Sequence, residues 1–457
     1  MEFVPQPYFP DETIAAIATP PGEGGVAIIR ISGDQALDVA AKVFSGPVHT
    51  YKTHTAHFGR IHNAQGEQID DVLLLVMLNK RSYTGENTVE IHCHGGSLVT
   101  RRVLEVVLQA GARAALPGEF TFRAFINGKI DLAQAEAVQE LICAKNERAL
   151  DAAESQLKGV LSSKIAHLQQ SLTLTAAILE AWVDFPEEGL EFATVDEICH
   201  DLHRTIKEME QLASTFHDGK ILHAGLSLCL IGSPNVGKSS LMNALLDKER
   251  AIVSPIPGTT RDILEDHLRL NGLHFKLSDT AGIREAGESI EQEGIRRSKA
   301  AMQQADLILL ILDAYKGLDK EDQALFAQVP KNKTIVVWNK IDLNPTPPAL
   351  DFAHCVRLSA KQRIGLEQLH AAIDAIIWQH GHPPKEEIVI TNIRHKEALN
   401  EAITSAKQLE QGLRQSVSPE FLTLDMRSCL SALGKIMGTN ISEDILSAIF
   451  SKFCIGK

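Results

Sequence analysis

A glycine-rich segment with one lysine and two serines carries the strongest chemical signal in the sequence. Residues 232–240 read GSPNVGKSS and match the pattern G-x-x-x-x-G-K-[ST] through Gly232, Gly237, Lys238 and Ser239. The apolar run LSLCLI precedes this segment, and SLMNALL, typical of a helix start, follows it. In such a context backbone N–H groups surround phosphates, Lys238 reaches the β and γ oxygens, and the Ser239 hydroxyl can bind magnesium. The segment therefore predicts a nucleoside triphosphate site.

Four short segments downstream complete a phosphate and base site. PGTTRD offers Thr260 as a second magnesium ligand. In DTAG, Asp279 can hold magnesium through water, and the N–H of Gly282 can contact the γ-phosphate. NKID and SAK each follow a predicted strand. The residues expected to contact GTP are Asn235, Val236, Gly237, Lys238, Ser239, Ser240, Ser254, Pro255, Ile256, Pro257, Gly258, Thr259, Thr260, Asp279, Thr280, Ala281, Gly282, Asn339, Lys340, Asp342, Ser359, Ala360 and Lys361.

Asp342 selects the base. Its two carboxylate oxygens can accept hydrogen bonds from both N–H donors on the edge of guanine. Adenine presents an acceptor at one of these places and would leave a polar group unpaired. Together with the other segments, Asp342 predicts that the nucleotide is GTP.

The group that orients the attacking water is not evident from the residues alone. Ile283 follows DTAG, at the place where Ras-like GTPases carry a glutamine, and an apolar side chain cannot orient water. The next polar stretch offers several charged side chains, and spacing does not choose among them: Arg284, Glu285, Glu288, Glu291 and Glu293.

Composition and charge restrict the class of protein. The chain has 457 residues, of which 44% are hydrophobic and 23% charged, so two or three ordinary globular domains are expected. The net charge of −13 argues against a general nucleic-acid binder. Seven scattered cysteines without a C-x-x-C pair indicate reduced thiols. The longest apolar runs are too short to cross a bilayer and the N-terminus is unlike a signal peptide, so we expect a cytoplasmic protein with no membrane partner.

The pattern of apolar residues divides the chain into three regimes. Short alternating runs up to about residue 125 predict an α+β domain. Residues 126–223 and 382–457 are helical in period, and we expect them to join into one discontinuous α-helical domain. Strands alternate with helices over residues 224–381, which predicts an inserted Ras-like α/β P-loop domain.

The C-terminal residues FCIGK leave three interpretations open. Cys454 stands fourth from the end, as in a prenylation motif, although Gly456 and Lys457 fit that motif poorly. The thiol could instead be buried after the apolar segment ILSAIFSKF. In the third interpretation the segment works in an active site.

The motifs PNVGKS, PGTTRD and DTAGIR resemble those of translation-factor-like GTPases, which include the Era and MnmE (TrmE) families. The segments IATPPGEGGVAIIRISG, SYTGEN, HCHGG, PGEFTFRAFINGKIDLAQAEA, DFPEE and FCIGK resemble the MnmE family, in order, along essentially the whole chain. An Era-like ribosome-assembly GTPase, the alternative, would need a C-terminal KH domain with a G-x-x-G loop, which the sequence does not contain.

The resemblance implies a function in tRNA modification. It implies a homodimer that works with the FAD-containing MnmG, in a heterotetramer or larger complex. The complex would bind certain tRNAs and add a carboxymethylaminomethyl or aminomethyl group at position 5 of their wobble uridine. The carbon would come from 5-formyl- or methylene-tetrahydrofolate, bound by an N-terminal domain that also dimerises.

The resemblance also assigns roles to particular residues. Glu291 would orient the water, and Lys238 and Cys454 would be catalytic. G domains would pair across a potassium ion whose ligands are Asn235, Ser254, Ile256 and Thr259. The folate contacts would be Arg30, Glu90, Lys129 and Lys457. A carboxylate suits the guanine-like edge of a pteridine, and cations suit the glutamate tail. His92 and His94, two apart on a predicted strand, suggest a metal only weakly, because a third ligand is not apparent.

Overall fold

The computed structural model describes residues 11–185, 194–246, 267–271, 273–278, 302–343, 346–378, 388–439 and 441–456. These residues form two compact units. One unit contains the described residues of Met1–Cys143, Ala153–Gln211 and Arg394–Lys457, and the other contains those of Ala144–Ala152 and Leu212–Ile393. In sequence, therefore, segments of the second unit lie between segments of the first.

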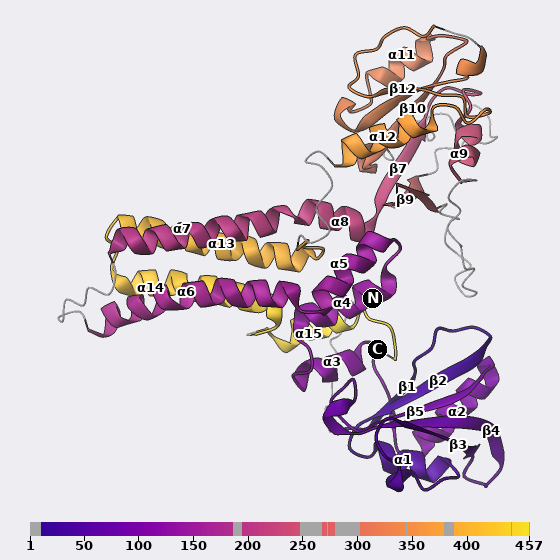
Figure 1. Cartoon of the computed structure of the whole chain (residues 1–457), viewed down its shortest axis with the longest axis vertical. Coiled ribbons are helices and arrows are strands. Elements are labelled where there is room, and N and C mark those ends of the chain that lie inside the picture. The colour runs from indigo at the N-terminus through magenta and orange to yellow at the C-terminus, as the bar shows by residue number, and fades with distance from the viewer. Residues whose placement is uncertain are drawn as a thin grey trace, which may run out of the picture. The chain divides into compact units, whose positions relative to one another are not determined.

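The first unit begins with a six-stranded sheet of order β3-β4-β5-β2-β1-β6 (Figure 1). All neighbouring strands are antiparallel except β1 and β6. Helices α1 (Ala36–Val43) and α2 (Ser97–Gln109) pack on one face. The strands are β1 (Ile14–Ile17), β2 (Gly24–Ser32), β3 (Thr55–His62), β4 (Gln68–Met77), β5 (Thr88–Gly95) and β6 (Arg113–Ala114).

Alternating side chains explain why this sheet has one covered face. Val72, Leu74 and Val76 of β4 are buried in a core with residues of α1 and α2. Successive residues of a strand point to opposite faces, so Leu73 lies on the other face, where it is 48% exposed. Phe58 of β3 is directly opposite Leu73 in the register and is 73% exposed. The second face therefore exposes two large apolar side chains in one chain, beside charged residues such as Arg60 and Asp71.

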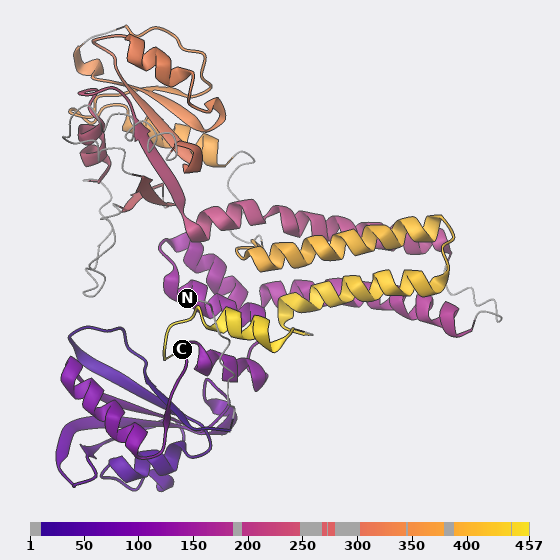
Figure 2. The same cartoon turned by 180° about the vertical axis from the view of Figure 1, so that it is seen from behind.

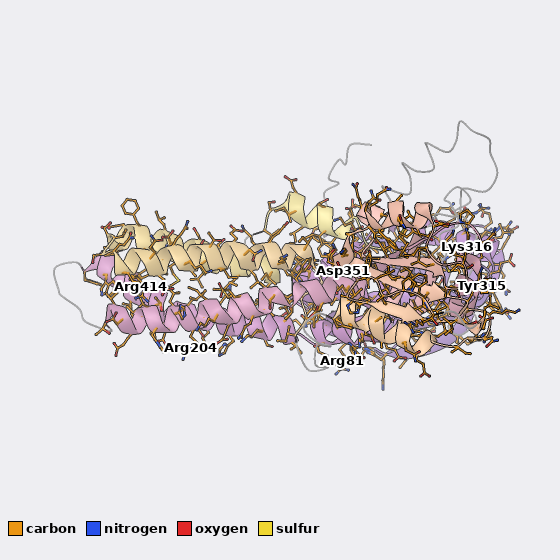
Figure 3. All side chains as sticks on the ribbon, turned by 90° about the horizontal axis from the view of Figure 1, so that it is seen from above. Arg81, Arg204, Tyr315, Lys316, Asp351 and Arg414 are labelled. Carbon is orange, nitrogen blue, oxygen red and sulfur yellow. The ribbon has the colours of Figure 1, made fainter. Side chains whose placement is uncertain are left out.

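Long helices form the rest of the first unit. Figures 1 and 2 show two antiparallel pairs, α6 with α14 and α7 with α13. Arg414 lies at the end of α13, and Figure 3 labels it together with Arg204 of α7. Ion pairs between Lys407 and Glu210 and between Arg427 and Glu180 join the partners within each pair. The helices are α3 (Glu119–Ile126), α4 (Leu132–Cys143), α5 (Glu147–Leu157), α6 (Val160–Asp184), α7 (Val195–Ser214), α13 (Ile393–Arg414), α14 (Pro419–Met437) and α15 (Glu443–Phe450). The start of α5, up to Ala152, and the end of α7, from Leu212, belong to the second unit.

A buried charged cluster joins the two sequence halves of the helical domain. Both oxygens of Glu136 on α4 accept hydrogen bonds from Arg394 on α13, at 2.9 and 2.6 Å. The Nε2 atom of His395 lies 2.7 Å from the same carboxylate. Burial by itself would raise the pKa of Glu136, but His395 and Arg394 outweigh it and lower the pKa to about 2. The discontinuous helical domain expected from the sequence is confirmed, and this cluster is one of the contacts that close it.

The second unit contains a six-stranded sheet of order β12-β11-β10-β7-β9-β8, in which only β8 is antiparallel to its neighbour. Numbered within the unit, this is the order 2-3-1-4-5-6 read from β8. The strands are β7 (Leu226–Ile231), β8 (His267–Leu270), β9 (Leu273–Ser278), β10 (Leu307–Asp313), β11 (Thr334–Asn339) and β12 (Cys355–Arg357), and the helices are α8 (Phe216–Ala224), α9 (Lys238–Leu246), α11 (Lys320–Phe326) and α12 (Leu366–Ile377).

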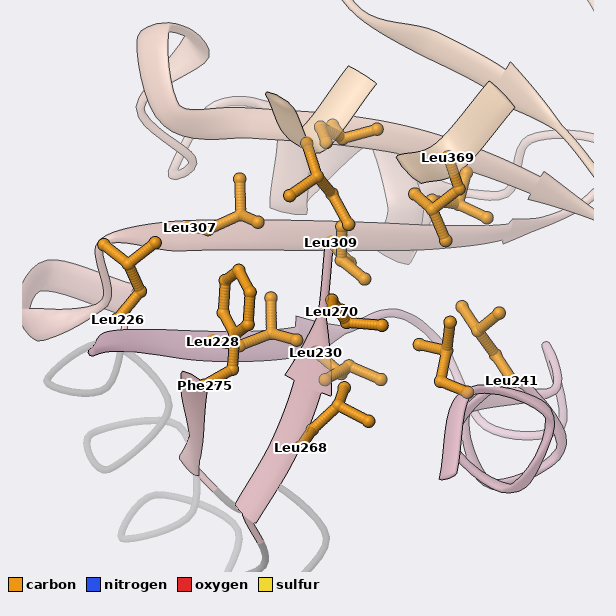
Figure 4. Close-up of a cluster of buried hydrophobic side chains, with 14 of the residues drawn as sticks. Leu226, Leu228, Leu230, Leu241, Leu268, Leu270, Phe275, Leu307, Leu309 and Leu369 are labelled. Carbon is orange, nitrogen blue, oxygen red and sulfur yellow. The ribbon is translucent and has the colours of Figure 1, made fainter. Parts of the chain in front are cut away.

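Strand β10 shows why this sheet is covered on both faces. Leu307, Leu309 and Ile311 belong to one core cluster, and the residues between them belong to another. Figure 4 shows residues of the first cluster, to which Leu307 and Leu309 belong together with Leu241 of α9 and Leu369 of α12. A continuous apolar run such as LILLIL is typical of a parallel strand with helices on both sides.

Among the described helices, none is long and apolar enough to cross a membrane.

Candidate functional site

The glycine-rich segment follows β7, at the point where the strand order of the second sheet reverses. Strand β7 has β9 on one side and β10 on the other, and Gly232 follows its carboxyl end. Ligands of open α/β sheets bind at such a switch point. A side chain at Gly232 would place Cβ 2.2 Å from the carbonyl oxygen of Ile311, and one at Gly237 would place it 2.2 Å from Nδ2 of Asn339. Both glycines also have positive φ, so the loop can close only with glycine at these positions.

Lys238 begins helix α9 and turns back onto the loop. Its Nζ atom donates to the carbonyl oxygens of Gly232 at 2.7 Å and Ser233 at 2.9 Å. Burial lowers the pKa of Lys238. The hydroxyl groups of Ser239 and Ser240 follow in the first turn of α9, where both residues are exposed. This geometry provides one cation and two accessible hydroxyl groups at a helix N-terminus, as phosphate and magnesium binding require.

Asn339 and Lys340 connect the glycine-rich loop to the base-recognition segments. The Nδ2 atom of Asn339 donates to the carbonyl of Val236 at 2.9 Å, and its Oδ1 atom accepts from the N–H of Ala360 at 3.0 Å. Lys340 has positive φ, and its Nζ atom donates to the carbonyl of Asn235 at 2.8 Å. Three sequence segments, each predicted from a short motif, therefore meet at one edge of the sheet.

Asp313 is a residue of this site that the sequence motifs did not reveal. It ends strand β10, and its Oδ2 atom lies 2.5 Å from Nζ of Lys340. Burial would raise the pKa of Asp313, but the hydrogen bonds from Lys340 and from the N–H groups of Lys316 and Tyr315 outweigh it and lower the pKa. An acidic residue at the carboxyl end of the buried run LILLIL was the available signal.

The remaining base-recognition residues lie near Asn339. Asp342 lies in the short turn Ile341–Leu343 and is partly exposed. Ser359 is fully buried, and its hydroxyl accepts from the N–H of Gln362 at 3.1 Å. Lys361 follows Ala360 and is exposed. The predicted residues that lie outside the described part of the chain are Ser254, Pro255, Ile256, Pro257, Gly258, Thr259, Thr260, Asp279, Thr280, Ala281, Gly282, Glu291 and Lys457.

A second group of predicted residues meets on the N-terminal sheet. Arg30 of β2 is directly opposite Glu90 of β5 in the register, and its Nε atom donates to Glu90 Oε1 at 2.8 Å. The guanidinium group also lies 5.7 Å from the ring centroid of Phe120. Both charged side chains are mostly buried, so the pair is fixed in position.

The C-terminal segment contacts Arg30 of this pair. The carbonyl of Gly456 accepts from Arg30 Nη1 at 3.1 Å, and the carbonyl of Cys454 accepts from the N–H of Gly118 at 3.3 Å. Phe453 is buried, with its ring 5.2 Å from that of Phe450. Cys454 itself is exposed. The interpretation of Cys454 as a buried structural thiol is therefore wrong, because Phe453 supplies the buried anchor instead.

Lys129, His92 and His94 have other partners. The Nζ atom of Lys129 donates to the carbonyl of Lys80 at 2.6 Å. His92 lies 3.4 Å from Glu90, whereas His94 lies 2.7 Å from Asp70. In the part of the chain that the structure describes, no three His, Cys, Asp or Glu side chains are grouped to hold a metal ion.

The strand order, the glycine-rich loop at the switch point and the linked base-recognition segments define the class: the second unit is a Ras-like P-loop GTPase domain, here joined to an α+β domain and a helical domain.

Comparison with known proteins identifies the family. Residues 132–454 match the family model described as MnmE helical domain, and residues 13–129 match the model described as GTP-binding protein TrmE N-terminus. The chain is 76% identical over 458 residues to the tRNA modification GTPase MnmE of Protochlamydia amoebophila (strain UWE25), covering 100% of both chains. It is 46% identical to the protein of the same name from Moorella thermoacetica, covering 98% of this chain and 100% of that one.

The chain therefore belongs to the MnmE family of tRNA modification GTPases, and it is a GTP hydrolase. A crystal structure of a variant of Aquifex aeolicus Era bound to GDP·AlF4⁻ is 29% identical, covers 40% of this chain and 67% of that chain, and has a TM-score of 0.26. Full-length similarity to MnmE proteins decides against the Era-like alternative.

Proposed function

We propose that this GTPase acts in tRNA modification with an FAD-dependent partner, MnmG. Together they add a carboxymethylaminomethyl or aminomethyl group at position 5 of the wobble uridine of certain tRNAs. The observation that carries this proposal is the docking of the C-terminal segment, in which the Gly456 carbonyl contacts Arg30 of the Arg30–Glu90 pair and Cys454, two residues earlier, stays exposed. A chain end held in this way is suited to a ligand site rather than to a lipid anchor.

The ligand of this N-terminal site is a tetrahydrofolate that carries one carbon, as a 5-formyl or methylene group. The donor set fits the group: the carboxylate of Glu90 matches a pteridine edge, and Arg30 and Lys129 are cations suited to the glutamate tail. Lys457, which follows Gly456, would contribute a further cation. When bound, the folate would supply the carbon of the new uridine substituent.

At the GTP site we propose magnesium ligation by Ser239 and Thr260 and potassium ligation by Asn235, Ser254, Ile256 and Thr259. The described residues fit these roles, since Asn235, within the glycine-rich loop, and Ser239, at the start of α9, are both exposed. Potassium would pair two G domains and stabilise charge that develops on the phosphates. Glu291 would orient the attacking water, and Lys238 would stabilise the β and γ oxygens.

We further propose that the protein is a cytoplasmic homodimer joined through its N-terminal domains. The exposed cross-strand pair Phe58 and Leu73 supports this, because it leaves two large apolar side chains uncovered on one sheet face in one chain. The complex with MnmG, a heterotetramer or larger, would hold the tRNA. The proposed domain limits are 1–125, 126–223, 224–381 and 382–457.

Nucleoside analysis tests the function. Cells that lack this protein should lose the modified wobble uridine from their tRNA, and the gene should restore it. Unchanged tRNA would reject the proposal. In the same assay a Cys454→Ser variant should fail to restore the nucleoside while hydrolysing GTP normally. Cys355→Ser is the matched control, because Cys355 is exposed but lies in the second unit.

A further inference from the structure

One chain connection contacts both the phosphate loop and the base-recognition loop of the GTP site. It runs from Asp313, at the end of β10, to Asp322, in the first turn of α11. Asp313 contacts Lys340 of the base-recognition segment, as described above. Asp322 contacts Ser233 of the glycine-rich loop. The sequence motifs account for neither carboxylate.

The contact between Ser233 and Asp322 is short and buried. The Oγ atom of Ser233 donates to Asp322 Oδ1 at 2.7 Å, across 89 positions of sequence. Ser233 is 7% exposed and Asp322 is 3% exposed. Hydrogen bonds to a charged acceptor are among the stronger ones in proteins, and a buried partner left alone is costly. This bond therefore fixes the position of Ser233 relative to α11.

The N-terminus of α11 holds Asp322 in place. The N–H of Asp322 donates to Asp319 Oδ1 at 2.9 Å, and the N–H of Asp319 donates to Asp322 Oδ2 at 3.2 Å. This reciprocal capping box uses one oxygen of Asp322 and leaves the other for Ser233. The preceding residues Tyr315 and Lys316, labelled in Figure 3, are largely exposed. The two hydrogen bonds of the capping box, rather than the exposed loop before it, therefore hold this part of the connection in position.

Ser233 is also bonded through its main chain. Its carbonyl oxygen accepts from Lys238 Nζ at 2.9 Å, so the same residue contacts α11 on one side and the phosphate-binding lysine on the other. We propose that Asp322 is a positioning residue for GTP binding, which acts through Ser233 to hold the glycine-rich loop in its phosphate-binding conformation. The bound phosphates are contacted by the loop and not by Asp322.

Nucleotide release from the full-length protein tests this role. With a fluorescent GDP analogue, Asp322→Ala and Ser233→Ala should each raise the dissociation rate about tenfold, the effect of losing one charge-assisted hydrogen bond. Because both changes remove the same bond, the double variant should release GDP no faster than the faster single variant. The KM for GTP should rise by a similar factor while kcat changes less than about threefold, since the loop binds substrate and transition state alike.

Two further variants separate positioning from general stability. Asp319→Ala removes only the bond from the Asp322 N–H, because the N–H of residue 319 can still donate to Asp322 Oδ2 and Ser233 keeps its bond to Asp322, so release should accelerate clearly less than in Asp322→Ala or Ser233→Ala. Asp322→Asn keeps one acceptor oxygen for Ser233 and should release GDP at an intermediate rate. It also keeps the experiment decisive if Asp322→Ala fails to fold. Release from Asp322→Asn and Ser233→Ala at the unchanged rate, or equal acceleration by Asp319→Ala, would overturn the proposal. Multiplicative effects in the double variant would overturn it too.

Discussion

Replacing Gly456 by alanine should detach the C-terminal segment from the N-terminal sheet. Gly456 has φ of +91°, a conformation that costs an L-residue roughly 1–2 kcal/mol. A Cβ atom at this position would lie 2.3 Å from the carbonyl oxygen of Ile17 and 2.9 Å from Cα of Ala18. Both contacts are with backbone, so the strain can be relieved only by movement of the C-terminal segment.

The expected magnitude follows from these contacts. When the segment moves, the bond from Arg30 Nη1 to the Gly456 carbonyl is lost, and a bond from a charged donor contributes about 1.5–3 kcal/mol. The docked segment must either keep the strain or give up this bond, so the docked state is disfavoured by about 2 kcal/mol. The ratio of docked to undocked segment should therefore fall about 30-fold.

Hydrogen exchange measured by mass spectrometry on peptides that cover residues 450–456 reports this ratio directly. Gly456→Ala should exchange about 30-fold faster there and should also weaken binding of 5-formyl-tetrahydrofolate, with GTP hydrolysis unchanged. Gly66→Ala is the matched control: Gly66 has φ of +81°, but nothing lies within 4 Å of its Cβ position. Equal protection of residues 450–456 in the two variants would refute the reasoning. Faster exchange with unchanged folate affinity would reject only the folate assignment.

Three further predictions follow from the described contacts and the proposed site. Asp342→Asn should shift the preference from guanine toward xanthine nucleotides, because xanthine offers an acceptor to the amide N–H. A competition assay that still favours GTP would exclude the role of Asp342. Hydrolysis should be much faster in potassium than in sodium, since the smaller ion fits the proposed ligands poorly, and equal rates in the two salts would reject the potassium site. Glu136→Gln should lower the free energy of unfolding at pH 7 by about 3 kcal/mol, because Arg394 and His395 lose a buried carboxylate partner. The folded pKa of Glu136 is about 2 against an ordinary 4.5, so this contribution is present above pH 4.5 and is lost toward pH 2; urea titrations at several pH values should show the difference shrink as the pH falls.

Local pattern was enough to predict the Ras-like class of the second unit and its glycine-rich loop. The run LILLIL is apolar throughout, which is typical of a strand covered on both faces, because such a strand has no exposed side to keep polar. The spacing of Gly232, Gly237 and Lys238 predicted a phosphate loop, because the loop is made within one short segment. Signals of this kind depend on neighbouring residues and are therefore readable in sequence.

Only the tertiary structure decided which distant residues meet. Asp313 and Asp322 contact the nucleotide loops across 27 and 89 positions, and no local spacing encodes such contacts. Cys454 was ambiguous in sequence because an apolar segment before a cysteine suits a core, a lipid or an active site. The structure excludes a core position for Cys454, since Phe453 is buried and Cys454 is exposed. By itself, the sequence determined a GTP-binding loop on an α/β sheet. The tertiary structure determined which side chains contact that loop and where the C-terminal segment docks. Both depend on surfaces that form only after distant segments have packed together.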